Sequence, residues 1–179
     1  DSRGKTISLS SENTAGVVRA YIQNSLFNTA GITNLFYIGP MFRRERPQAG
    51  RLRQFHQIGC EALGADSSLL DAETIIYASA LLKSLKIKEE NLEIQISSVG
   101  CENCRPAYNQ KLLSYLETNK SSLCETCNQR INKNPLRVLD CKEEKCQNII
   151  ESAPKIIECL CADCSQFFAE LEDYLKTAN

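Results

Sequence analysis

The chain has 179 residues, of which 42% are hydrophobic and 24% charged, a composition typical of a soluble globular protein with one or two domains. It contains no run of about 18 apolar residues, so the sequence predicts no membrane-spanning helix, and its first residues lack the basic start and apolar core of a signal peptide. The formal net charge is only −1, so any contact with nucleic acid or phosphate has to come from a local patch.

The first hundred residues alternate between helix and strand patterns. An apolar stripe with a period near 3.6 residues predicts a helix over residues 12–31, capped by Asn13 or Thr14. Two runs rich in apolar and aromatic residues, 34–42 and 52–64, flank a loop broken by proline and glycine and predict an antiparallel hairpin. The other elements predicted in this part are a strand at 7–9, a helix at 71–85 capped by Asp71, and a strand at 91–100.

The composition changes at Gly100, after which cysteine pairs, short helices and polar connections follow. Helices are predicted over 106–117, entered at Pro106, and over 122–131 and 161–176. We therefore expect an α+β fold in two parts, an α+β piece at 1–100 and a small helical, cysteine-rich piece at 101–179, with the boundary at 98–101.

The cysteines are unevenly placed, because nine of the ten lie between residues 101 and 164. Many are in C-x-x-C pairs, which favours a reducing, cytoplasmic location and a metal-binding subregion over a disulfide framework. Two pairs nineteen residues apart have the spacing of a four-cysteine zinc site: Cys101, Cys104, Cys124 and Cys127. A second set comes from Cys141 and Cys146 with Cys161, Cys164 and the neighbouring Cys159. The alternative is that these are free, partly buried thiols. A thioredoxin-like redox role lacks the βαβ context.

The loop of the predicted hairpin is strongly basic. Residues 43–53 contain five arginines and a single acid, Glu45. Because strand side chains alternate between faces, one face is predicted to carry Tyr37, Gly39, Met41 and Arg43 together with Phe55, Gln57, Gly59 and Glu61. Glycine inside a strand often marks the close approach of a ligand, and arginine suits phosphate because its planar fork donates two parallel hydrogen bonds. The alternative is a solvated charged tip on an ordinary sheet surface.

Residues 39–64, GPMFRRERPQAGRLRQFHQIGCEALG, resemble motif 2 of the histidyl-tRNA synthetases, a class II aminoacyl-tRNA synthetase family. Residues 11–21, SENTAGVVRAY, resemble the L-R-P-E-G-T-A segment of the family, with departures at Ser10, Ser11 and Asn13. Residues 134–142, NPLRVLDCK, resemble part of its insertion domain. The resemblance implies a partial class II catalytic core with an antiparallel sheet, followed by the insertion domain that grips the tRNA acceptor stem.

The resemblance also implies roles for individual residues. For ATP, bound with Mg²⁺, it implies Arg43 at the α-phosphate, Glu45 at the adenine side, Arg51 at the outer phosphates and Phe55 stacked on adenine. For histidine it implies Glu12, Thr14, Gln57, Gly59 and Glu61, with Gly59 giving the substrate room and the two glutamates favouring its ammonium group. For the tRNA acceptor end it implies Arg44, Arg46 and Arg53.

The implied activity belongs to the whole protein, which would activate histidine with ATP, charge tRNA-His and act as a homodimer. Motif 1, motif 3 and the anticodon-binding domain are not in the sequence, so we expect a central fragment that is inactive alone. One alternative is the family's paralogue that regulates ATP phosphoribosyltransferase, which has no need of an intact arginine loop. Another is a zinc-stabilised RNA-binding module, which would leave the ordered series Gln57, Gly59, Glu61 unexplained.

Overall fold

The computed structural model describes residues 4, 6–29, 31–46 and 48–178 and confirms a mixed α+β fold. The chain divides into two compact units, residues 1–81 and 82–179. This division falls within a helix and differs from the boundary predicted at 98–101. The composition changes at Gly100, but residues 92–100 form no strand that would join them to the sheet of the first unit.

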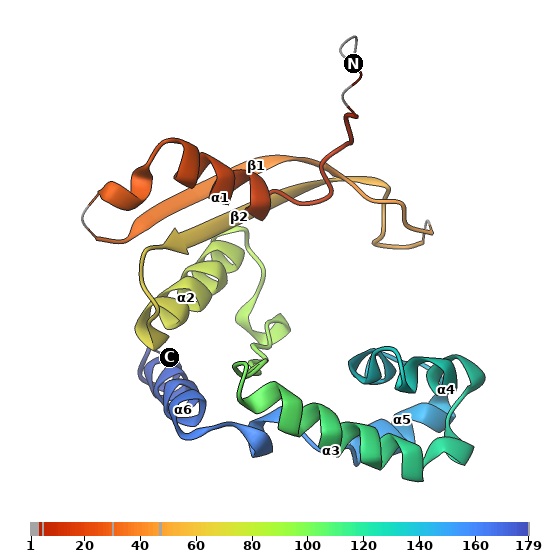
Figure 1. The fold of residues 1–179 in the computed structure, drawn as a ribbon. Helices are drawn as coiled ribbons and strands as arrows, with labels where there is room; N and C mark the ends of the chain where they lie inside the picture. Colours follow the sequence, from red (N-terminus) through yellow and green to blue (C-terminus); the bar gives the residue numbers. More distant parts are fainter. Residues whose placement is uncertain (1–3, 5, 30, 47, 179) are drawn as a thin grey trace. The chain divides into compact units, whose positions relative to one another are not determined.

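The first unit is built on one antiparallel hairpin, formed by β1 (Thr33–Phe42) and β2 (Gln54–Leu63) in agreement with the prediction (Figure 1). Both strands are ten residues long and pair along their whole length, from Thr33 opposite Leu63 to Phe42 opposite Gln54. Helix α1 (Thr14–Gln23) lies along this hairpin and contacts both strands. Helix α2 (Ser68–Ser84) follows β2.

Two helix boundaries differ from the prediction. The helix expected over 12–31 ends as α1 at Gln23, because Ser25 has a left-handed φ of 52°, and a short 3-10 turn, η1 (Leu26–Asn28), follows. The helix expected to start at Asp71 begins three residues earlier, so that Asp71 lies in the first turn of α2 and does not cap it. A carboxylate in the first turn still favours the helix through its dipole.

The strands predicted at 7–9 and 91–100 are not formed. A strand is defined by its ladder partner, and among the described residues the named strands are β1 and β2 alone. Next to the segment 7–9 there is one hydrogen bond to the hairpin: the backbone N–H of Phe42 donates to the carbonyl oxygen of Ser10 at 2.8 Å. This bond holds the segment before α1 against the end of β1.

The second unit is helical, as predicted, and contains one helix that the sequence did not indicate, α5. Its α-helices are α3 (Cys104–Thr118), α4 (Glu125–Ile131), α5 (Glu144–Glu151) and α6 (Ala162–Thr177). Short 3-10 turns connect them: η2 (Glu89–Asn91), η3 (Lys120–Ser122), η4 (Pro135–Val138) and η5 (Ile156–Cys159).

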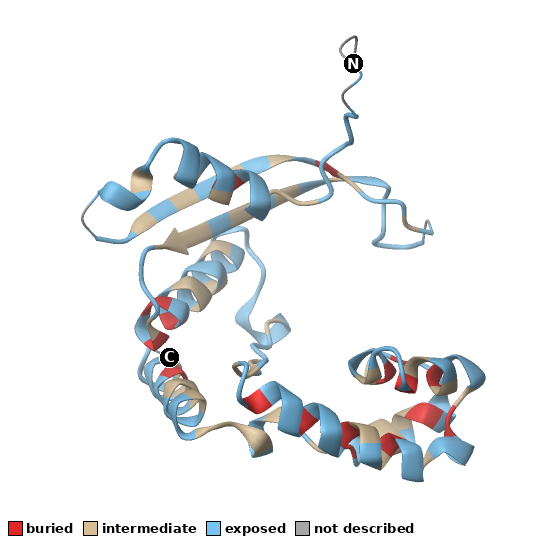
Figure 2. Ribbon diagram, viewed as in Figure 1, coloured by how far each residue is buried: buried red, intermediate tan, exposed pale blue. Residues whose placement is uncertain are grey.

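Buried residues of this unit gather along α3 and the short helices beside it (Figure 2). The largest fully buried side chains are Leu112, Leu116, Ile131 and Val138, together with two cysteines, Cys127 and Cys146. The core therefore contains sulfur at its centre. No helix among the described residues is long and apolar enough to cross a membrane.

Candidate functional site

The register of the hairpin brings the predicted ligand-facing residues onto one face. Gly39 lies opposite Gln57, Tyr37 opposite Gly59 and Leu35 opposite Glu61. Directly paired residues point to the same side of an antiparallel sheet, and all of these residues are half-buried, whereas the alternate residues Phe36, Ile38, His56 and Ile58 are exposed. The two-residue alternation predicted from the sequence is therefore confirmed.

Gln57 has an unpaired acceptor on this face. Its side-chain oxygen Oε1 is buried and has no hydrogen-bond partner among the described residues. A buried polar atom without a partner costs about 1–3 kcal/mol, and such atoms are rare in native proteins. A bound ligand with an N–H or ammonium donor would remove this cost.

The two glycines of the face have different surroundings. The space above Gly59, expected to admit a ligand, is occupied by the ring of Tyr37, which an added Cβ would overlap. Gly39 has no atom within 4 Å of the position where a Cβ would lie, so the open space is there. Sequence reasoning missed this role of Tyr37, although an aromatic residue opposite a strand glycine is a known stabilising pair.

This difference gives a matched pair of variants. Gly59→Ala is expected to lower the free energy of unfolding of the chain by about 1–3 kcal/mol, because the methyl group overpacks the site and displaces Tyr37. Gly39→Ala is expected to leave stability unchanged or raise it by up to about 1 kcal/mol, because it has room and a strand glycine is entropically unfavourable. Urea unfolding followed by circular dichroism measures both, and equal losses would contradict the packing seen here.

Arg43 follows the last residue of β1, and two contacts fix its side chain. Its guanidinium carbon lies 5.1 Å from the ring centroid of Phe55, a cation–π geometry, and its Nε donates to the carbonyl oxygen of Ser11 at 2.9 Å. The two terminal nitrogens make no hydrogen bond to the described residues. An oriented fork with unused donors is suited to an anionic ligand such as a phosphate.

The other arginines of the loop are exposed, and two of them interact with Glu45. Arg51 Nη1 lies 3.1 Å from Glu45 Oε2, and Arg53 Nε donates to the Glu45 carbonyl oxygen at 3.3 Å. An exposed ion pair of this kind contributes about 0–1 kcal/mol, so a phosphate could replace the carboxylate at Arg51. Arg44 and Arg46 are exposed on the same loop.

The predicted histidine-binding acids are not brought together by the contacts described. The carboxylate of Glu12 accepts hydrogen bonds from the backbone N–H groups of Thr14 at 2.8 Å and Ala15 at 3.4 Å, so it caps α1. Glu61 instead lines a cavity of about 520 Å³ between β2 and α2, with Leu70, Glu73 and Tyr77. Asn13 holds the N-cap position that the sequence predicts, but its side chain makes no capping hydrogen bond, and the Glu12 carboxylate supplies these bonds instead.

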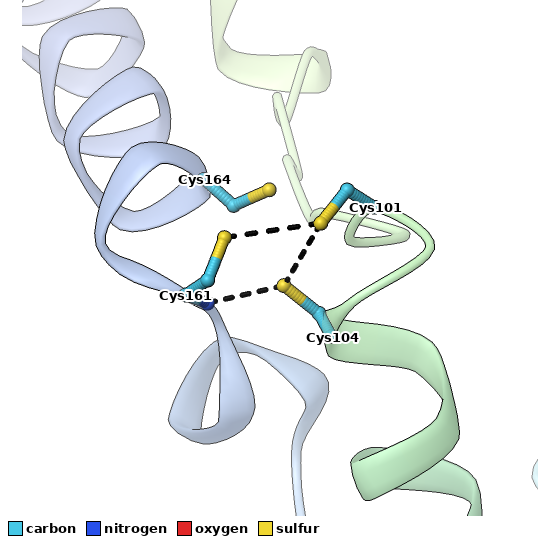
Figure 3. Close-up of side chains that lie close together, drawn as sticks. All are labelled: Cys101, Cys104, Cys161 and Cys164. Carbon is cyan, nitrogen blue, oxygen red and sulfur yellow. Dashed lines mark hydrogen bonds between the residues drawn. The ribbon is translucent and has the colours of Figure 1, made fainter.

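Eight of the ten cysteines form two groups in the second unit. Within each group the sulfur atoms all lie within 4.8 Å of one another. The α3–α6 cysteine group consists of Cys101, Cys104, Cys161 and Cys164, which point toward one another in Figure 3. The α4–α5 cysteine group consists of Cys124, Cys127, Cys141 and Cys146.

These groups correct the pairing predicted from spacing. The pair Cys101 and Cys104 is joined to the pair beginning at Cys161, and not to Cys124 and Cys127, which meet Cys141 and Cys146 instead. Helix α3 separates the first two pairs along the chain, so their short sequence spacing does not bring them together. Cys159 belongs to neither group, and Cys60 is exposed on β2.

Backbone N–H groups lower the pKa of one thiol in each group. The N–H of Cys161 donates to Cys104 Sγ at 3.0 Å and lowers the pKa of Cys104 to about 6. The N–H of Cys127 donates to Cys124 Sγ at 3.4 Å and lowers the pKa of Cys124 to about 7. Burial raises the pKa of Cys146. Each group therefore contains one thiol that loses its proton more readily than a free cysteine, and its four clustered sulfurs could bind a metal ion.

Comparison with known proteins identifies relatives along nearly the whole chain. The family profile described as histidyl-tRNA synthetase matches residues 1–133. The histidine–tRNA ligase of Halothermothrix orenii is 47% identical over 175 residues, 98% of this chain and 41% of that protein. The histidine–tRNA ligase of Clostridioides difficile is 48% identical over 179 residues, 100% of this chain and 42% of that protein.

A solved structure shares the fold. The apo histidyl-tRNA synthetase of S. aureus superposes with a TM-score of 0.65 at 30% sequence identity, covering 94% of this chain and 38% of that one. The chain thus spans about two fifths of the length of the curated relatives reported above.

Proposed function

The chain belongs to the histidyl-tRNA synthetase family, and from this premise we propose that the protein of which it is part is a histidine–tRNA ligase. The observation that carries the proposal is the hairpin face, on which Phe55 and Gln57 follow each other along β2. The guanidinium of Arg43 lies over the Phe55 ring, and the buried amide oxygen of Gln57 is unpaired among the described residues. The same residues are the ones that the motif 2 resemblance assigns to ATP and histidine.

In the proposed reaction, the carboxylate of histidine attacks the α-phosphorus of ATP and pyrophosphate leaves. Arg43 would bind the α-phosphate and stabilise the negative charge that grows on its oxygens. Arg51 would release Glu45 and bind the outer phosphates of ATP instead, which would enter the site as the Mg²⁺ complex. Phe55, now stacked on Arg43, would offer its ring edge or other face to adenine.

For histidine, Gln57 Oε1 would accept a hydrogen bond from the substrate, and Glu61 would favour its ammonium group. The open space at Gly39 would admit the substrate, while Gly59 keeps Tyr37 in place. The Glu12 carboxylate already accepts hydrogen bonds from the first backbone N–H groups of α1. Glu12 and Thr14 would therefore contribute to histidine binding by fixing the backbone at the start of α1. Arg44, Arg46 and Arg53 would meet the acceptor end of tRNA-His in the transfer step.

The full-length protein tests this proposal directly. We expect histidine-dependent exchange of pyrophosphate into ATP, followed by charging of tRNA-His. The regulatory paralogue would show neither activity, and an RNA-binding module would bind tRNA without exchange. The relatives reported above bear the name histidine–tRNA ligase and give no support to these two alternatives. Homodimerisation and a cytoplasmic location stay predictions of the family resemblance and the cysteine pattern.

Glu61→Gln in the full-length protein is expected to raise the KM for histidine about tenfold or more, because a hydrogen bond to a charged partner contributes about 1.5–3 kcal/mol. The KM for ATP should change little. Glu73→Gln is the matched control, since Glu73 lines the same cavity from α2 and has no predicted contact with substrate. Equal effects of the two variants on the KM for histidine would remove Glu61 from the amino-acid site.

A further inference from the structure

The sulfur–sulfur distances in the two cysteine groups match those around a single tetrahedral metal ion. With zinc–sulfur bonds of about 2.3 Å, a tetrahedron places its four sulfurs about 3.8 Å apart. Cys101 Sγ lies 3.5 Å from Cys104 Sγ and 3.8 Å from Cys161 Sγ. In the other group, Cys124 Sγ lies 3.9 Å from Cys141 Sγ.

Disulfide bonding does not account for four sulfurs that converge on one point. A disulfide brings one sulfur to one partner at about 2.05 Å, whereas here every sulfur has three others within 4.8 Å. An iron–sulfur cluster places several iron and sulfide ions between its thiolates and would spread them farther apart. Packing of thiols as small apolar groups explains burial, but it gives no reason for four sulfurs to converge twice.

Backbone N–H groups already point at the sulfurs, as in the outer shell of a metal site. In the α3–α6 group Cys101 Sγ accepts from the N–H of Asn103 at 3.3 Å, and Cys104 Sγ accepts from that of Cys161 at 3.0 Å. In the α4–α5 group Cys146 Sγ accepts from the N–H of Cys124 at 3.2 Å. These donors would offset the net charge of −2 that four thiolates and one divalent cation carry.

We propose that the second unit binds two zinc ions, one in each cysteine group, with the α4–α5 pairs nested in sequence between the two pairs of the α3–α6 group. Thiolate ligands in a tetrahedral set select zinc among the common divalent ions. This inference rests on the cysteine geometry and is independent of the proposed ligase activity.

The two ions would stabilise different parts of the unit. The α4–α5 site joins residues of the core, where Cys127 and Cys146 are fully buried. The α3–α6 site joins the start of α3 to the start of α6, so it closes a segment of about 60 residues and removes loop entropy from the unfolded chain. Its cysteines other than Cys104 are only half-buried, so zinc should leave this site first.

Metal content tests the proposal. The full chain, produced in metal-replete medium with reductant, is expected to hold two zinc ions by elemental analysis. Cys60→Ser and Cys159→Ser should keep both, because neither residue belongs to a group. Zinc at about one ion per chain or less, or iron in its place, would overturn the proposal of two zinc sites.

Double variants test the nested pairing. Cys104→Ser with Cys161→Ser alters one site and should leave one zinc, whereas Cys104→Ser with Cys127→Ser alters both and should leave none. Pairing by sequence spacing predicts the reverse result. If a variant fails to fold, ¹¹³Cd NMR of the unaltered chain decides: two resonances with the chemical shift of all-thiolate coordination are expected, and one or none would refute two sites.

Discussion

Replacing Arg43 with alanine in the full-length protein is expected to lower kcat for histidine-dependent pyrophosphate exchange by about 100- to 1,000-fold, the usual cost of removing one charge-stabilising donor from an acyl- or phosphoryl-transfer site. The structure supports a large effect because this side chain is already oriented. The ring of Phe55 and the Ser11 carbonyl oxygen fix the guanidinium, so little reorganisation is needed when charge develops.

Arg43→Lys separates charge from geometry. Lysine keeps the positive charge but cannot donate two parallel hydrogen bonds or stack flat on Phe55, so most of the loss should remain. Arg19→Ala, at an exposed position on α1, is the control and should exchange pyrophosphate at the normal rate. Exchange by Arg43→Ala within about threefold of normal would exclude Arg43 from the α-phosphate site.

The hairpin is the part of the fold that sequence predicts best. Alternation of residues 34–42 and 52–64 assigns both faces correctly, because a period of two is local and a slip by one residue would expose the half-buried face. Which side chains fill the site depends on the pairing between the strands, which is not a local property of the sequence. Tyr37 fills the space over Gly59 only because the register places the two residues opposite each other. Without that register, the sequence cannot tell which of the two glycines, Gly39 or Gly59, leaves open space for a ligand.

The segment before α1 shows a similar limit. The sequence indicates an acid at position 12 but not its partner, and in the structure the Glu12 carboxylate binds the first N–H groups of the helix. Likewise, the strands expected at 7–9 and 91–100 have suitable residues but no neighbouring strand among those described. Strand propensity describes a surface that fits a sheet, and it cannot supply the partner.

The cysteine groups show how much of a metal site can be predicted from residues that are close in sequence. The C-x-x-C pairs at 101–104 and 124–127 are local, and each contributes both of its cysteines to one group. Which pairs converge depends on the path of α3 and on α5, a helix that the sequence did not indicate. The structure clusters the eight cysteines that the sequence proposes as ligands, but it combines the pairs differently from the spacing, so spacing between pairs is the weaker signal.

Removing zinc is expected to unfold the lobe formed by α3, α4 and α5 while leaving the hairpin intact. The core of this lobe is a single small cluster around Leu112, Leu116 and Ile131, and three of its ten buried residues are cysteines. A domain of about 60 residues buries too little apolar surface to be more than marginally stable, and this lobe, which covers residues 104–151, is no larger. A structural zinc site, in contrast, contributes about 10–16 kcal/mol of apparent binding free energy to folding in small zinc domains. Metal loss should therefore exceed any single side-chain effect.

Hydrogen exchange followed by mass spectrometry locates the effect. After treatment of the protein with a strong chelator under reducing conditions, backbone amides of 104–151 should exchange at rates near those of an unfolded chain, while those of β1 and β2 keep their protection. Cys127→Ser should reproduce this pattern, and Cys159→Ser should not, since its thiol lies outside both groups. Unchanged exchange in 104–151 after verified metal removal would mean that the buried thiols stabilise the core as apolar side chains without an ion.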